Sequence, residues 1–130
     1  MKEITVVAEN EVGVLALVAE ALGSVGVNIE AISAYGHQNS AILRILTNDV
    51  SSAIRVLTKV HKIKISEADT LIYNMNNRPG ELGKITRKLA NAGINLESVY
   101  IVGKKLDHTE VAICPLAKDL EKTRQILGMK

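Results

Sequence analysis

The feature that most constrains how this 130-residue chain can fold is an internal repeat. Five identical residues recur 67 positions apart: Gly13 and Gly80, Leu15 and Leu82, Gly26 and Gly93, Asn28 and Asn95, and Glu30 and Glu97. Composition alone does not explain glycines and an asparagine repeated at one spacing, so the chain holds one supersecondary unit twice. We place the first copy at residues 1–68 and the second at residues 69–130.

The spacing between the copies grows from 67 to 70 after Gly36 and Gly103, where Asp49 matches Asp119 and Leu57 matches Leu127. The simplest explanation is a hairpin that is about three residues longer in the second copy, because loops accept insertions more readily than strands or helices do.

Both copies show the same succession of local patterns. Residues 3–9 alternate between apolar and polar, which predicts a strand. Apolar residues at helical spacing predict helices over 15–25 and 82–92, which Gly26 and Gly93 end. Further strands are predicted over 28–35, 41–47, 95–102 and 110–116, and Asp49 and Asp119 are the expected N-caps of two more helices. Residues 62–76 can supply a closing strand for the first copy and an opening strand for the second.

The resulting order is βαββαβ followed by βαββα, which predicts an α+β fold of two ferredoxin-like domains. Each domain has an antiparallel sheet with its helices on one face. After the last predicted helix only Gly128, Met129 and Lys130 remain, so the second copy lacks its last strand. Its sheet would have an open edge, and we expect a homodimer to form in response.

Composition and charge argue against several classes of function. The net charge is +2 and the basic residues form no stripe, so we expect no nucleic-acid partner. No apolar run reaches the roughly 18 residues of a membrane span, and a single cysteine favours a reducing compartment. We therefore expect a cytoplasmic protein without a membrane partner. The three histidines are scattered and no catalytic set is apparent, so we expect no metal, no cofactor and no enzyme activity.

The segments that follow the first strand of each copy are the candidate ligand-binding loops. Residues 10–15 and 77–82 each end in a Gly-x-Leu sequence that opens a helix. A helix N-terminus offers unpaired N–H groups and a positive dipole end, which suit a carboxylate. Asn28 and Asn95 follow glycine turns, and their side-chain amides offer both a donor and an acceptor. Together these groups suit the carboxylate and ammonium that all free amino acids share.

The first copy, through residues 9–15 and 26–32, resembles an ACT domain, and residues 77–82 and 93–99 of the second copy are closer still to that pattern. The resemblance covers essentially the whole chain, and the doubled arrangement of the two copies is similar to stand-alone tandem ACT proteins. It implies side-by-side pairing of sheets and an effector, usually an amino acid, at a domain or subunit interface. By position the expected ligand-binding residues are Asn10, Gly13, Val14, Leu15, Asn28, Ile29, Arg78, Gly80, Glu81, Leu82, Asn95 and Leu96. The first copy departs from the family by having Val12 where proline is usual.

Each of these residues also has a plainer interpretation. Gly13 and Gly80 can be turn glycines, Asn28 and Asn95 can bond local backbone, and Arg78 and Glu81 can be exposed loop charges.

Three functions compete. The leading hypothesis is a regulatory protein that senses a free amino acid. A second hypothesis is the regulatory small subunit of an amino-acid biosynthetic enzyme such as acetolactate synthase, because residues 4–32 are also similar to the ACT segment of such subunits. This second hypothesis would add a catalytic enzyme as a partner. In those subunits, however, the rest of the chain is a different domain, whereas here it is a second ACT-like copy. A third hypothesis, an RNA-binding βαββαβ domain, needs aromatic residues on its first and third strands, where only Tyr73 is present. A metallochaperone is excluded because no Cys-x-x-Cys loop is present.

Overall fold

The computed structural model describes all 130 residues, and the chain divides into two compact units, Met1–Ala68 (unit 1) and Asp69–Lys130 (unit 2). Unit 1 contains, in chain order, β1 (Lys2–Glu9), α1 (Val14–Ser24), β2 (Ala31–His37), β3 (Ser40–Leu46), α2 (Val50–Leu57) and β4 (Ile63–Asp69), whose last residue is the first of unit 2. Its strands form one sheet in the order β2-β3-β1-β4, which is the ferredoxin-like arrangement.

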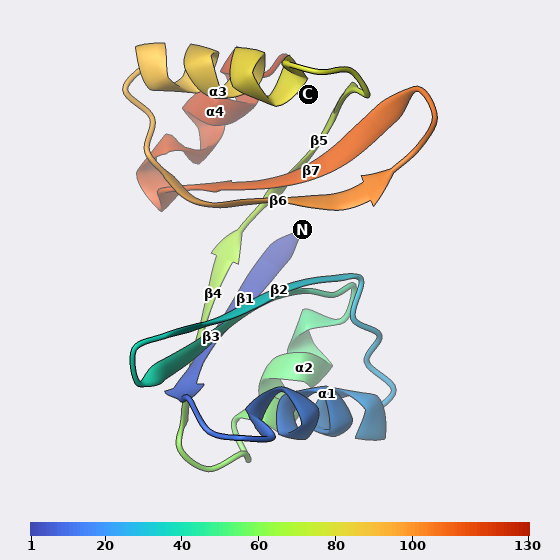
Figure 1. The fold of residues 1–130 in the computed structure, drawn as a ribbon, viewed down its shortest axis with the longest axis vertical. Helices are drawn as coiled ribbons and strands as arrows, with labels where there is room; N and C mark the ends of the chain where they lie inside the picture. The colour runs from blue at the N-terminus through green and yellow to red at the C-terminus, as the bar shows by residue number, and fades with distance from the viewer. The chain divides into compact units, whose positions relative to one another are not determined.

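The core of unit 1 lies between this sheet and its two helices, which cover the same face of the sheet (Figure 1). Alternate residues of β1 and β3 point toward the helices because successive strand side chains point to opposite faces. Ile4 and Val6 from β1 and Leu43 from β3 are buried there against Val18 and Leu22 from α1. The apolar stripe of α1 and the alternation of β1 therefore meet in one cluster, as the sequence pattern predicts.

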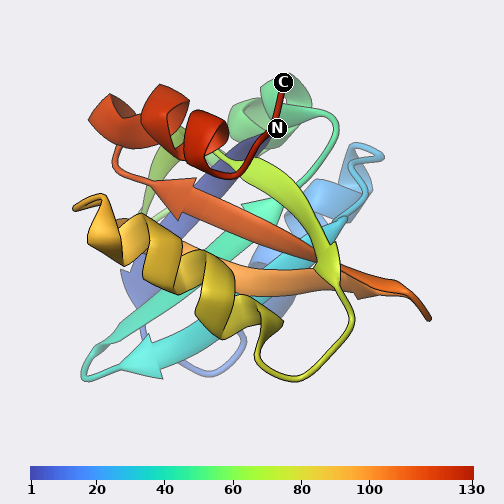
Figure 2. The ribbon, with the colours of Figure 1, turned by 90° about the horizontal axis from the view of Figure 1, so that it is seen from above.

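Unit 2 contains β5 (Leu71–Asn76), α3 (Glu81–Asn91), β6 (Leu96–Lys104), β7 (His108–Pro115), a short 3₁₀ turn (Ala117–Asp119) and α4 (Leu120–Ile126). Its three strands pair in the order β5-β7-β6, and α3 and α4 cover one face of the sheet (Figures 1 and 2). No fourth strand follows α4, so β5 and β6 are the edge strands of this sheet. The prediction of two ferredoxin-like domains, the second without its last strand, is confirmed.

The extra residues of the second copy are divided between two places. Ala34 pairs with Leu43 in unit 1 and Ile101 pairs with Val111 in unit 2, so the second hairpin is one residue longer. The other two extra residues lie between Ile113 and Asp119, the stretch in which the 3₁₀ turn forms. The predicted insertion was therefore correct in size, but the hairpin does not hold all of it.

Two local predictions were wrong. The second strand of unit 1 begins at Ala31 and not at Asn28, because the chain turns at Gly26 and the first ladder bond is from Glu30 N to Leu46 O, at 2.8 Å. Asp49 caps α2 by accepting a bond from Ser52 N at 3.1 Å, but the Asp119 side chain caps nothing. The 3₁₀ turn that precedes α4 already occupies that position.

None of the helices is long and apolar enough to span a bilayer.

Candidate functional site

The loop between β1 and α1 turns sharply at Gly13, whose φ of 91° lies in the left-handed region. Glycine enters this region without the steric cost that a Cβ atom adds. Gly80 has a φ of 87° at the equivalent place in unit 2, so both copies have a glycine where the backbone is left-handed. No side chain caps α1, and the first helical bond is from Leu17 N to Gly13 O at 2.9 Å. The N–H groups of Leu15 and Ala16 precede that bond and point out of the helix end.

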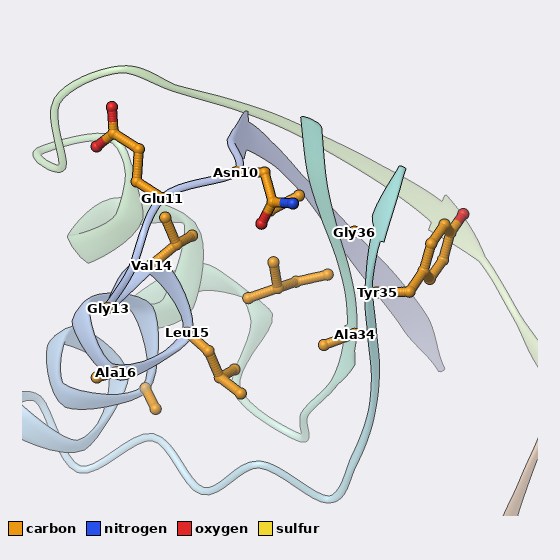
Figure 3. Close-up of a pocket in the computed structure, with 12 residues that line it drawn as sticks. Asn10, Glu11, Gly13, Val14, Leu15, Ala16, Ala34, Tyr35 and Gly36 are labelled. Atoms are coloured by element: carbon orange, nitrogen blue, oxygen red, sulfur yellow. The ribbon is translucent and has the colours of Figure 1, made fainter. Parts of the chain in front are cut away.

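A cavity of about 580 Å³ lies between this helix end and the β2–β3 hairpin. Its lining residues are mostly small or aliphatic: Asn10, Glu11, Gly13, Val14, Leu15, Ala16, Ala19, Ala34, Tyr35, Gly36, Ala41 and Leu43. Figure 3 shows Leu15 reaching from α1 toward Ala34, with Asn10 above them and the Tyr35 ring directed away from the helix. The cavity therefore has apolar walls and polar groups at the end where the loop meets the helix.

The Asn10 side chain lies directly on the backbone of Gly36. A Cβ atom at position 36 would come within 2.7 Å of Asn10 Nδ2, so any larger residue there would displace the amide. The Asn10 backbone N–H donates to Asn39 O at 2.8 Å, which ties the loop to the hairpin tip. The hairpin thus holds the amide at the cavity, as Figure 3 shows.

Glu11 is the one charged residue among those that line this cavity. Its carboxylate lies at the rim and points away from β2 in Figure 3. The positive end of α1 has no acidic residue in its first turn. The first turn of α1 therefore carries no carboxylate of its own to compensate the helix end, which favours an anionic group from outside.

The structure brings together four of the six residues predicted in the first copy, since Asn10, Gly13, Val14 and Leu15 all line the cavity. Asn28 and Ile29 do not line it: Ile29 packs against the core, and Asn28 is exposed with its amide 3.4 Å from Glu30 Oε1. Both precede the start of β2, whereas the cavity borders the last residues of that strand.

Sequence reasoning missed the β2 wall, which Ala34, Tyr35 and Gly36 form. The signal was available in the topology. In a ferredoxin-like sheet the β2–β3 hairpin ends beside the carboxyl end of β1, and here Glu9 pairs with Ser40. The Gly36/Gly103 repeat also marked the position.

Unit 2 builds a different arrangement from the same loop. Asn77 Nδ2 donates to the carbonyl oxygens of Lys105 at 2.9 Å and Leu106 at 3.4 Å, so this amide is bonded to the longer hairpin. Glu81 is 9% exposed in the first turn of α3, and its Oε1 lies 3.3 Å from Arg78 and 3.3 Å from Lys84. The predicted residues Arg78 and Glu81 are therefore paired with each other.

A cavity of about 310 Å³ lies beside this loop, and of the six residues predicted in the second copy it includes Arg78 alone. The other five, which do not line it, are Gly80, Glu81, Leu82, Asn95 and Leu96.

No protein-family model matches the sequence, and no curated protein matches it. Solved structures do match. Protein BT0572 from Bacteroides thetaiotaomicron is 26% identical, with a TM-score of 0.83, over 98% of this chain and 85% of that one. The regulatory subunit of aspartate kinase from Thermus thermophilus is 16% identical, with a TM-score of 0.71, over 98% and 90%. The corresponding subunit from Thermus flavus is 15% identical, with a TM-score of 0.66, over 98% and 90%.

The strand order and these neighbours define the class of fold, a tandem pair of ferredoxin-like domains. The fold that the resemblance to tandem ACT-domain proteins implied is thereby confirmed.

Proposed function

We propose that the chain is a regulatory protein that binds a free amino acid in the cavity of unit 1. One observation carries the proposal: an uncapped helix N-terminus and a side-chain amide open into the same apolar cavity. The N–H groups of Leu15 and Ala16 suit the ligand carboxylate, and the Asn10 amide supplies an acceptor for its ammonium. These groups recognise the part that all amino acids share.

The walls select the side chain. Leu15, Ala34 and Leu43 offer apolar contacts and no charged partner, so we propose an aliphatic amino acid as the effector. A ligand with a second carboxylate would meet the rim charge of Glu11, which disfavours it.

The mouth of the cavity carries exposed apolar residues, including Leu15, which is 49% exposed, and Tyr35, which is 48% exposed. Exposed apolar groups around a binding site favour a covering surface. We propose that a second ACT-type copy completes the site in a cytoplasmic homodimer. The similar aspartate kinase subunits are regulatory, which supports regulation of an enzyme partner and a non-catalytic role here.

Calorimetric titration with each free amino acid tests the proposal, and Ala16→Glu is the decisive variant. Ala16 is exposed in the first turn of α1, where a carboxylate stabilises the helix but repels a bound carboxylate. At about 6 Å and an effective dielectric constant near 20, this repulsion amounts to roughly 2–3 kcal/mol before salt screening, so we expect affinity to fall at least about tenfold.

Gly83→Glu is the matched control, because Gly83 is exposed 67 positions later, in the same turn of α3. It should leave the affinity unchanged. The proposal fails if no amino acid binds at millimolar concentration, or if both variants weaken binding equally. Recovery of a stoichiometric catalytic subunit with the tagged protein would favour the small-subunit hypothesis.

A further inference from the structure

The unit 2 cavity differs in chemistry from the unit 1 cavity. It lies beside the loop between β5 and α3, and its lining residues are Met75, Asn76, Asn77, Arg78, Pro79, Ile101, Lys104 and Thr109. We infer that this cavity binds a small organic dianion, a compound with a phosphate group or two carboxylates. The inference goes beyond the proposed amino-acid site, because it concerns other residues and another class of ligand.

The charges that line the cavity are both positive. Lys104 is exposed and forms no ion pair in the structure. Arg78 lies 3.3 Å from Glu81 Oε1, but the same oxygen also faces Lys84 at 3.3 Å. One carboxylate between two cations leaves an excess of positive charge beside the cavity. A guanidinium and an ammonium at one site are suited to a phosphate or a carboxylate pair.

The carboxylates of the hairpin lie elsewhere. Lys104 pairs with Thr109, and both line the cavity, whereas Glu110 pairs with Gly103 and falls on the opposite face by alternation. Asp107 lies 2.8 Å from His108 Nδ1, and the hydrogen bond from His108 lowers the pKa of that carboxyl group. The strand pairing therefore leaves the cavity without a carboxylate of its own.

Comparison of the two copies shows that the fold does not require these cations. Arg78 is equivalent to Glu11 and Lys104 is equivalent to His37 at the 67-residue spacing, so unit 1 builds the same loop and strand without either cation. The turn glycines and the apolar helix positions are shared, but Arg78 stands where unit 1 has the acidic Glu11, and Lys104 stands where it has His37. Arg78 also pairs with Glu81, whereas no ion pair in the structure accounts for Lys104, and ligands of different charge would explain the difference between the two cavities.

The test uses two-dimensional NMR of the full chain during titration with glycerol 3-phosphate and with succinate, and with glycerol and succinamide as neutral counterparts. We expect one or both dianions to shift the amide signal of Thr109 in a saturable way, and the neutral compounds to leave it unchanged. A response to glycerol 3-phosphate alone assigns a phosphate ligand, and a response to succinate alone assigns a dicarboxylate.

Two charge-matched variants decide whether the cavity is responsible. Lys104→Gln should weaken binding at least about tenfold, the usual size for loss of one charge-assisted contact. Lys105→Gln removes the same charge one residue away, outside the cavity lining, and should change affinity less than about twofold.

Absence of saturable shifts with both dianions would overturn the inference, as would equal weakening by the two variants. Ala16→Glu should leave dianion binding intact. This variant separates a failure here from a failure of the amino-acid site in unit 1.

Discussion

Leu22 and Leu89 provide a matched pair of core perturbations, one in each unit. They occupy equivalent positions in α1 and α3, 67 residues apart, and both are 0% exposed. The core cluster of unit 1 includes Leu22 and that of unit 2 includes Leu89, and the two clusters share no residue. We predict that Leu22→Ala destabilises unit 1 and that Leu89→Ala destabilises unit 2.

The expected loss follows from complete burial. Replacing a fully buried leucine by alanine removes its transfer free energy and leaves a cavity, at a total cost of about 2.7–5 kcal/mol. A unit of this size is stable by roughly 3–10 kcal/mol. Each substitution therefore removes a large fraction of the stability of its own unit.

Amide hydrogen exchange measures this effect residue by residue. In Leu22→Ala we expect protection to fall in β1 and β3 and to remain in β5 and β7, with the reverse in Leu89→Ala. If either variant lowers protection equally in both units, the two cores unfold as one cooperative body and the reasoning is wrong. A loss below about 1 kcal/mol would refute the assigned burial.

Two further predictions concern single contacts. Gly36→Ala should displace the Asn10 amide, because the added Cβ would lie 2.7 Å from Nδ2, and should weaken amino-acid binding in calorimetry without lowering the melting temperature. Gly103→Ala is its control, since the nearest atom there is a carboxylate oxygen at 3.2 Å, and unchanged affinity in the Gly36 variant would contradict the assignment. The hydrogen bonds from Ser52 lower the pKa of Asp49 below its ordinary value of 3.8. A depressed pKa adds stability that is present at neutral pH and lost as the pH falls below about 4. Asp49→Asn keeps the cap and should remove that acid-sensitive part of thermal unfolding.

The repeat and its apolar periodicity were sufficient to predict the fold. Helix stripes at Val18 and Leu22 and alternation at Ile4 and Val6 each leave one face to bury, and a sheet with helices on one side buries them all. Element boundaries were less predictable. Asp119 has the residue type of a cap, but whether a side chain reaches the helix end depends on the turn before it.

The candidate site was predicted only where it is local in sequence. Asn10, Gly13 and Leu15 were found because one loop carries them. The opposite wall comes from the end of β2, and strand pairing brings it there. Local periodicity does not report which end of a strand faces a loop, so Gly36 was missed despite its repeat in the sequence.

The two helix ends differ in a way that has a thermodynamic consequence. In unit 2, Glu81 supplies a carboxylate to the first turn of α3, which compensates the positive end of the helix from within the protein. In unit 1, Val14 occupies the equivalent position, and α1 has neither a cap nor an acidic residue there. A ligand carboxylate would complete this helix end, so binding stabilises unit 1 by an amount that grows with the logarithm of the ligand concentration above Kd. We therefore expect a saturating amino acid to slow hydrogen exchange in α1 and β2 and to leave α3 unchanged. Equal protection of α3 would show that the two helix ends are not as unequal as their residues imply.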